Sequence, residues 1–346
     1  MPDDTHLPHW GFASPGRLRD ELTALALDGV KTATAGLLVE FELDGEPLPN
    51  AGERQVLLDS AEAPVAIVET TSCRVARLAD VDDVHAIDEG EGYADAAAFR
   101  VSHERFWNGY RDELRRRLGD PSFVLDDDTP IVLERFRVVE RLDVPPPPVA
   151  SREIRRAGPE RMPHLAGVLA RAMAPEPMSS WPLGAGPDLA RRVRGQFLVV
   201  DGAFAREGWI HEAADGLGVM ALEPPGSMEQ DAELLHAADE ALAALTPDGG
   251  ARYQAFWDWI AEVTPKEPHW FLDQLAVEPA AHGRGIGRAL LEHAIAAAEA
   301  DRLPLLLETG TRDNVALYER FGFRVTRAED APGGGPHVWF MLRAPC

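Results

Sequence analysis

A glycine-rich turn, His282-Gly-Arg-Gly-Ile-Gly287, is the segment of this chain whose residue types most directly suggest chemistry. An apolar stretch ending at Val277 precedes the turn, and an amphipathic helical pattern follows it. Glycines let the backbone approach a ligand closely, and the free amides and positive dipole end of a helix N-terminus suit phosphate oxygens. Strand, glycine turn and helix in this order are the context that a phosphate-binding turn requires. The turn therefore predicts a pyrophosphate site.

Two other interpretations compete with this one. A tight strand-to-helix turn without a ligand is the structural alternative. A dinucleotide-binding Rossmann start is disfavoured because that motif belongs to the first βαβ unit, whereas this turn lies near the C-terminus.

A second segment combines a lysine with hydroxyl groups. Lys31, Thr32 and Thr34 follow directly after Gly29, which caps a predicted helix. A lysine and two hydroxyls on a turn can bind an anion or a polar ring, although a solvated loop lysine is the ordinary alternative. Farther along, Asp88-Glu89-Gly90-Glu91-Gly92 predicts a solvated acidic turn.

Hydrophobic periodicity and breaker residues predict the elements that position these side chains. In the N-terminal part they are helices over 17–28 and 102–118 and strands over 37–43, 55–58, 65–75 and 130–139. In the C-terminal part they are helices over 159–173, 188–199 and 228–245, strands over 208–212 and 218–222, and then strand, glycine turn, helix, strand, helix and strand.

Four consecutive prolines, 145–148, mark the boundary between these parts, because a proline run is extended and acts as a spacer. We predict an N-terminal domain over 1–142, a linker over 143–151 and a C-terminal domain over 152–346. Strands dominate the first domain, which favours a small mixed β-barrel with flanking helices, so that the fold class is α+β.

The glycine turn resembles the acyl-CoA-binding motif of the GNAT N-acetyltransferases, with His282 where the family has glutamine or arginine. The segment Asn314-Val-Ala-Leu-Tyr318-Glu-Arg-Phe-Gly-Phe323 resembles the second signature of that family. Asn314 and Tyr318 are four residues apart and share a helix face, and Leu317 with Phe321 is predicted on the opposite, core-facing side. The sequence of residues 266–272, 307–309 and 337–345 is similar to that of the puromycin N-acetyltransferase group.

This resemblance implies an α/β domain with a central, mostly antiparallel mixed sheet, acetyl-CoA as cosubstrate and a small amine as acceptor. Tyr318 is then the candidate that protonates the departing thiolate. Glu308, at the end of an apolar strand, is the first candidate for the base, and Asp273 is the second; either can instead orient water, bind a cationic substrate or be structural. The residues implied in binding acetyl-CoA are Leu275, Ala276, Val277, His282, Gly283, Arg284, Gly285, Ile286, Gly287, Arg288 and Asn314.

Residues 11–142 resemble the ASCH domain, a small barrel similar to the PUA fold and associated with RNA or modified nucleosides. The resemblance rests on the segments 29–34, 56–71, 89–92 and 132–139. Some members hydrolyse the amide of N4-acetylcytidine with a lysine, a threonine and a glutamate, and the matching positions are Lys31, Thr34 and Glu89. Other members are ribonucleases or are presumed to bind RNA.

Net charge limits the partners. Basic residues number 34 and acidic residues 58, a formal charge of −24, with 15 basic and 30 acidic side chains in residues 1–150. This balance excludes binding to long nucleic acid or to an anionic membrane through a polybasic surface. The net negative charge attracts small cations. A nucleoside or a short RNA remains compatible with the first domain.

The remaining composition predicts a cytoplasmic protein. The two cysteines, Cys73 and Cys346, offer no disulfide framework, the N-terminal residues lack the pattern of a secretory signal, and no apolar run has the length of a membrane span. No metal site is predicted. Four aromatic residues, Phe256, Trp257, Trp259 and Trp270, are expected either in the core or around an amine pocket.

Three functions follow as hypotheses. The first is an acetyl-CoA-dependent N-acetyltransferase with an accessory ASCH domain, whose acceptor is a small, antibiotic- or nucleoside-like amine. The second is a nucleoside- or RNA-binding protein whose GNAT half senses acetyl-CoA. The third is a bifunctional enzyme with a second, amide-hydrolysing site.

Overall fold

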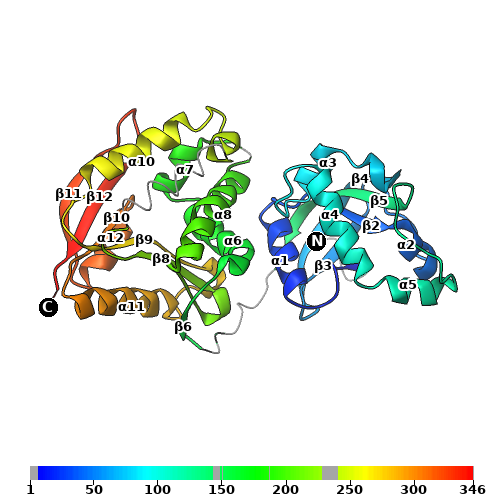
Figure 1. Ribbon diagram of the computed structural model, residues 1–346, viewed down its shortest axis with the longest axis horizontal. Helices are drawn as coiled ribbons and strands as arrows, with labels where there is room; N and C mark the ends of the chain where they lie inside the picture. Colours follow the sequence, from blue (N-terminus) through cyan, green and yellow to red (C-terminus); the bar gives the residue numbers. More distant parts are fainter. Residues whose placement is uncertain (1–6, 143–148, 150, 187, 228–240, 346) are drawn as a thin grey trace. The chain divides into compact units, whose positions relative to one another are not determined.

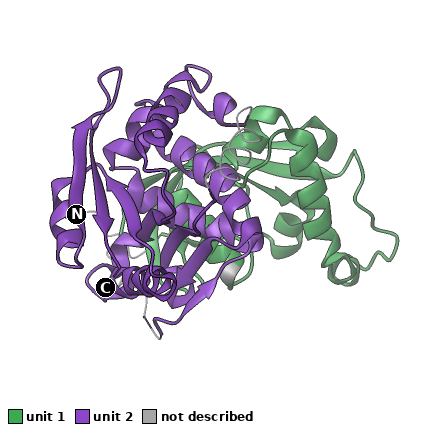
Figure 2. Cartoon of the chain, turned by 60° about the vertical axis from the view of Figure 1, so that its left-hand side comes forward, with its two compact units in different colours: residues 1–145 green, residues 146–346 purple. Residues whose placement is uncertain are grey.

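The computed structural model describes residues 7–142, 149, 151–186, 188–227 and 241–345 (Figure 1). The chain divides into two compact units, residues 1–145 and 146–346 (Figure 2). Most of the predicted linker 143–151 lies outside the described residues, so the domain boundaries stay predictions. Among the helices described, none has the length and the apolar character that crossing a bilayer would require.

The first unit is built on a five-stranded sheet in the order β1-β3-β4-β5-β2. The parallel pair is β1 with β3, and the other described pairs are antiparallel. Each edge strand pairs with one neighbour, and closure into a barrel stays a prediction. The elements are β1 (His9–Trp10), α1 (Arg17–Leu27), β2 (Ala33–Leu37), α2 (Leu38–Asp44), β3 (Arg54–Leu58), β4 (Pro64–Arg77), α3 (Asp83–Asp88), α4 (Ala96–Asn108), α5 (Arg111–Leu118) and β5 (Pro130–Arg141).

Two predicted elements of this unit are wrong in type or extent. Residues 38–44 form the helix α2, not a strand, and Gly45 ends it in a left-handed conformation (φ 67°). The apolar run from Leu37 to Leu43 resembles a strand because periodicity does not separate the two types over so short a segment. The predicted helix 102–118 is two helices, α4 and α5, which are separated at Gly109 and Tyr110.

The second unit has a seven-stranded mixed sheet in the order β11-β12-β10-β9-β8-β7-β6, which confirms the central, mostly antiparallel mixed sheet that the resemblance implied. The pair β9–β10 is parallel and the other pairs are antiparallel. Its elements are β6 (Ile154–Arg156), α6 (Met162–Met173), α7 (Pro177–Leu183), α8 (Leu189–Glu207), β7 (Ile210–Ala213), β8 (Gly218–Glu223), α10 (Ala251–Val263), β9 (Trp270–Val277), α11 (Ile286–Asp301), β10 (Leu305–Thr309), α12 (Arg312–Glu319), β11 (Arg324–Asp330) and β12 (His337–Arg343).

Strand β8 shows how this sheet separates two cores. Its side chains alternate between faces, so Val219 and Ala221 join the core formed by α6 and α8. Met220 and Leu222 join the opposite core, which α11 covers. Helices therefore pack against both faces of the sheet. Strands β9 and β10 lie side by side in the middle of the sheet.

The predicted helices of this unit are confirmed with different ends. Helix α8 continues beyond the predicted residue 199 to Glu207, where Gly208 adopts φ 78°. The aromatic segment 253–260 lies within α10. The predicted helix 228–245 falls outside the described residues except for its last turn, 241–245, which is helical.

Candidate functional site

The central feature of the second unit is a divergence of its two parallel strands. Strand β9 pairs with β10 at Trp270 and Phe271, whereas on its other edge it pairs with β8 as far as Val277. Beyond Phe271, the described pairings leave the β10-facing edge of β9 without a partner strand. Backbone amides and carbonyls exposed in this way can pair with an extended, amide-containing ligand as if it were another strand.

The glycine turn closes this gap at the carboxyl end of β9. Gly285 is the N-cap of α11 and has φ 80°, a conformation that residues with a side chain rarely adopt. Gly287 lies close to β9, because a Cβ built there would be 3.3 Å from Val277 Cγ2. His282 Nε2 lies 3.0 Å from the Val277 carbonyl oxygen, and Arg152 donates to the Arg284 carbonyl at 2.7 Å. The amides at the start of α11 thus face the divergence.

A cavity of about 440 Å³ occupies the divergence, and we call it the large cavity. Every residue that the sequence predicted for catalysis or acetyl-CoA binding in this unit lines it. These residues are Asp273, Leu275, Ala276, Val277, His282, Gly283, Arg284, Gly285, Ile286, Gly287, Arg288, Glu308, Asn314 and Tyr318.

Tyr318 lies in this cavity on α12 beside two carboxylates. Burial, together with the negative charges of Glu176 and Glu308, raises the pKa of its hydroxyl to about 12. The hydroxyl is therefore protonated at neutral pH and available as a proton donor.

Glu176 and Thr309 line the cavity without having been predicted. The Asn314 side-chain amide donates to Glu176 Oε1 at 3.3 Å and to Thr309 Oγ1 at 3.1 Å. Burial raises the pKa of Glu176, although the hydrogen bond from Asn314 opposes that effect. Glu176 precedes Pro177 at the start of α7, in a segment without a recognisable motif, so no sequence signal pointed to it.

The predicted core-facing placement is wrong for Leu317, which is 43% exposed. Phe321 is partly buried and packs against the core under α11, as predicted. Both side chains also line the large cavity. Helix α12 has no fully buried residue in the described structure; it forms a wall of the cavity, while its Val315 and Tyr318 side chains pack against the core. Of the four aromatic candidates, Trp257 lines the cavity, whereas Phe256 is buried in a core cluster.

The first unit has a cavity of its own, of about 300 Å³, which we call the aromatic cavity. Its lining includes Thr34, Glu91 and His103 together with six large aromatic side chains. These six are Trp10, Phe12, Phe41, Tyr93, Phe106 and Trp107. A planar ring with polar edges has the shape and chemistry that such a lining can hold.

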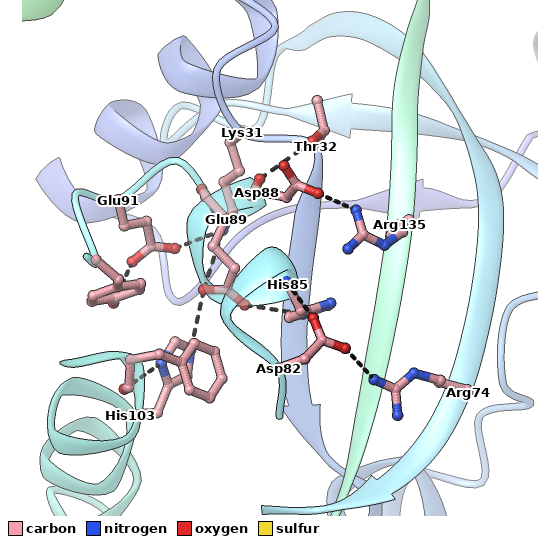
Figure 3. A network of polar contacts seen from close by, with 12 residues as sticks. Lys31, Thr32, Arg74, Asp82, His85, Asp88, Glu89, Glu91, His103 and Arg135 are labelled. Atoms are coloured by element: carbon pink, nitrogen blue, oxygen red, sulfur yellow. Dashed lines mark hydrogen bonds and ion pairs between the residues drawn. The ribbon is translucent and has the colours of Figure 1, made fainter. Parts of the chain in front are cut away.

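Lys31 and Glu89 are buried beside this cavity, so the predictions of a solvated lysine and a solvated acidic turn are wrong. They are 1% and 0% exposed. The ammonium of Lys31 is 2.6 Å from Glu91 Oε1 and 3.8 Å from Glu89 Oε2. Figure 3 shows Lys31 with Glu89 and Glu91, and His85 and His103 next to the Glu89 carboxylate. His85 and His103 approach Glu89 to 3.7 and 3.4 Å.

Backbone contacts explain why the lysine and acidic segments meet. The amide of Thr32 donates to the Asp88 carbonyl at 2.8 Å. Gly90 has φ 69°, and a Cβ there would be 2.4 Å from the Val30 carbonyl oxygen, so glycine is required for this approach. Of the three predicted residues, Thr34 lines the aromatic cavity, while Lys31 and Glu89 reach its edge through Glu91 and His103. Glu91 is the polar residue that the sequence analysis missed, although it lies in the same acidic segment.

Comparison with known families divides the chain in the same way. Residues 9–140 match the family model of the ASCH domain. Residues 234–325 match the family model of the acetyltransferase (GNAT) domain, which supports acyltransferase activity.

Solved structures with similarity to this chain include both types. An ASCH domain from Lactobacillus crispatus JV V101 is 28% identical over 38% of this chain and 79% of that chain, with a TM-score of 0.34. A structure described as histone acetyltransferase HPA2 and related acetyltransferase, from Corynebacterium glutamicum ATCC 13032, is 25% identical over 57% and 97%, with a TM-score of 0.44. The polyamine N-acetyltransferase of Drosophila melanogaster is 14% identical over 56% and 99%, with a TM-score of 0.35.

The predicted closeness to the puromycin N-acetyltransferase group is not confirmed by these matches and stays a prediction. The two family models agree with the motifs at the glycine turn and at Lys31. The chain therefore carries an ASCH domain at its N-terminus and a GNAT acetyltransferase domain at its C-terminus.

Proposed function

We propose that the second unit transfers an acetyl group directly from acetyl-CoA to a small amine. The observation that supports this most is the convergence of the unpaired edge of β9, the glycine turn, Tyr318 and Glu308 on the large cavity. Acetyl-CoA would supply the activated acetyl thioester.

The residues present fit that cosubstrate. The β9 backbone at Leu275 and Val277 offers hydrogen bonds to the amides of pantetheine. The amides at the start of α11, from Gly285 onward, offer donors to the pyrophosphate. Local amides are needed here because the formal charge of the chain, −24, opposes the approach of phosphates.

Two groups then handle protons. Glu308, next to Tyr318 in the cavity, accepts a proton from the ammonium form of the acceptor so that its lone pair can attack. Tyr318 donates its hydroxyl proton to the sulfur that departs from the acetyl group. Asp273 remains the alternative base, since it lines the same cavity.

A direct assay tests this proposal. The full chain is incubated with acetyl-CoA and a panel of primary amines that includes puromycin, and thiol release is measured. We expect turnover with at least one amine. Tight binding of acetyl-CoA without turnover of any amine would instead support a sensor function.

A bulky side chain at Gly287, where the glycine turn packs against β9, should weaken acetyl-CoA binding. Gly287→Val places a branched side chain against Val277 and Leu275, whose atoms lie 3.3 and 3.6 Å from the new Cβ. We expect at least a tenfold higher Kd for acetyl-CoA in calorimetry. Ala300→Val, on the exposed end of the same helix, is the control for the cost of a β-branched residue in a helix. Equal Kd values in both variants would remove the turn from the binding site.

A second function is proposed for the first unit, because the buried Lys31–Glu91 pair lies at the edge of the aromatic cavity. We propose that this cavity binds a nucleoside and hydrolyses an amide on its base, as in ASCH members that act on N4-acetylcytidine. Thr34, which lines the cavity, would be the nucleophile or would position water.

Deacetylation of N4-acetylcytidine by the full chain tests this second function. We expect Thr34→Ala to lower the rate at least tenfold. Thr32→Ala is the matched control, because Thr32 lies on the same segment but does not line the aromatic cavity. An unchanged rate in Thr34→Ala would exclude Thr34 from the mechanism, and no hydrolysis by the unmodified chain would leave nucleoside binding as the alternative.

A further inference from the structure

A second, smaller cavity adjoins the large cavity, and no role described above uses it. Its volume is about 90 Å³, and we call it the inner chamber. Gln196 on α8, Trp257 on α10, and Asp273 and Gln274 on β9 line both cavities. The two cavities therefore meet at these four side chains.

Buried hydrogen-bond acceptors line the inner chamber beside apolar side chains such as Val200, Phe204 and Ile260. Gln196 and Gln274 are 4% and 7% exposed, and the side-chain oxygen of each is buried without a hydrogen-bond partner among the described residues. The amide nitrogen of Gln274 donates to Asp273 Oδ2 at 3.1 Å, which leaves its oxygen as the group that needs a donor. Buried acceptors of this kind cost free energy unless a ligand or water supplies an N–H or O–H.

A buried carboxylate adds to these acceptors. It belongs to Glu223, at the end of β8, which is 1% exposed. His269 has its Nδ1 2.7 Å from the Glu267 carbonyl oxygen, so Nδ1 carries the hydrogen of that contact. Thr264 already donates its hydroxyl hydrogen to the Ile260 carbonyl at 2.7 Å.

Aromatic walls complete the lining. Tyr253, Trp257 and Phe271 surround the acceptors, and the faces of such rings attract cations. The indole N–H of Trp257 is a donor without a partner among the described residues, and Trp257 lies where the two cavities adjoin.

We propose that the inner chamber binds a second cationic group of the acceptor, so that the substrate class is a diamine or an aminoalkylguanidine, with a positive charge at each end. This inference rests on the proposed acetyltransferase function. An ammonium or guanidinium group carries only N–H donors, which matches the buried acceptors, and about 90 Å³ has room for a few non-hydrogen atoms. The end in the large cavity loses its proton and is acetylated, whereas the end in the inner chamber keeps its charge.

An uncharged alkyl end would be a poor occupant. It would displace water from the oxygens of Gln196 and Gln274 without replacing the hydrogen bonds, and sites built to bind N–H groups discriminate strongly against analogues that lack them. The net negative charge of the protein also favours a dication during encounter.

The test compares α,ω-diamines of three to six carbons with n-alkylamines and amino alcohols of equal length. We expect kcat/KM to be at least tenfold higher for the diamine at one or more lengths. Equal or higher values for the alkylamines at every length would overturn the proposal, and a preference for the amino alcohols would assign the chamber to a hydroxyl group instead.

A variant pair locates the preference. Gln196→Leu should reduce the diamine preference at least fivefold while acetyl-CoA affinity and the thermal midpoint stay near their original values. Gln254→Leu, on the exposed face of α10, is the matched control and should leave the preference unchanged. Indistinguishable ratios in the two variants would contradict the assignment of Gln196.

Calorimetry separates failure of this inference from failure of the proposed function. Binding of a diamine and of the matching alkylamine is measured without acetyl-CoA. If no amine is acetylated but the diamine binds at least tenfold more tightly, and Gln196→Leu removes that difference, the chamber assignment holds and the transferase proposal fails. If amines are acetylated without any diamine preference in binding or turnover, the transferase proposal holds and the chamber assignment fails.

Discussion

Tyr318→Phe is expected to lower kcat for amine acetylation by about 10²- to 10⁴-fold, the usual range for loss of a general acid or base. The substitution removes only the hydroxyl, so the ring keeps its packing against Phe323, whose centroid is 5.7 Å away. Steady-state thiol release measures kcat, and calorimetry measures the Kd of acetyl-CoA, which should change by less than about threefold.

The control for this variant is Tyr110→Phe. The hydroxyl of Tyr110 donates to a carboxylate oxygen of Glu40 at 3.3 Å, but Tyr110 lies in the first unit. A kcat for Tyr318→Phe within threefold of this control would exclude the hydroxyl as the proton donor.

The alkaline side of the rate profile gives an independent check. Because burial and the carboxylates of Glu176 and Glu308 raise the pKa of Tyr318 to about 12, its hydroxyl stays protonated between pH 7 and about pH 10. Loss of the Tyr318 proton therefore causes no fall in kcat over that interval. A fall in kcat over this interval in the unmodified protein that is absent in Tyr318→Phe would contradict the raised pKa.

Lys31→Met is expected to destabilise the first unit by about 3–5 kcal/mol, the range for removing one partner of a buried ion pair. Methionine fills a similar volume, so the cost arises from leaving the carboxylates of Glu89 and Glu91 without their cation. Amide hydrogen exchange of peptides from 9–141 in the full chain measures this loss locally.

The effect of Lys31→Met should depend on pH in a defined direction. Burial raises the pKa of Glu89, but the charge of Lys31 and the neighbouring imidazoles of His85 and His103 outweigh burial and hold the pKa below 4.5. Burial likewise lowers the pKa of Lys31, and the charges of Glu89 and Glu91 outweigh it and raise the value above 10.5. The buried pair of Lys31 and Glu89 therefore makes its full contribution to the free energy of unfolding between about pH 4.5 and 10.5. It is lost as pH falls through the lowered pKa of Glu89 or rises through the raised pKa of Lys31.

Lys266→Met provides the control, since Lys266 is the only other lysine and is exposed. Its free energy of unfolding should stay within about 0.5 kcal/mol of the original protein. An equally small change for Lys31→Met at pH 7 would show that the buried pair does not stabilise the unit.

The residues around the glycine turn could be predicted from sequence because their chemistry is local. Gly285 caps a helix that begins one residue later, and the same few residues that form the turn also supply the amides. Asn314 and Tyr318 share a cavity wall for a similar reason, since a helix alone fixes an i, i+4 pair. In each case a short segment determines its own conformation.

Short apolar segments were predicted less well, because a local pattern does not say what a side chain packs against. Leu38–Asp44 is helical although its apolar content suited a strand. Leu317 looked like a core residue, yet α12 borders a cavity and leaves it 43% exposed. The partner surface, not the segment, decided both outcomes.

The sequence alone determined the two domain families, the division near the proline run and the location of the glycine turn, because each depends on a contiguous motif. Tertiary structure decided which distant groups meet. Glu176 and Asn314 are 138 residues apart in the chain, yet the tertiary structure brings Asn314 Nδ2 to 3.3 Å from Glu176 Oε1. The tertiary structure also buries Lys31 beside Glu89 and Glu91. It also brought Gln196 on α8 and Gln274 on β9 into one chamber. Such pairs depend on how helices pack on a sheet, and the burial that results sets their charges, their pKa values and the ligand chemistry they can recognise.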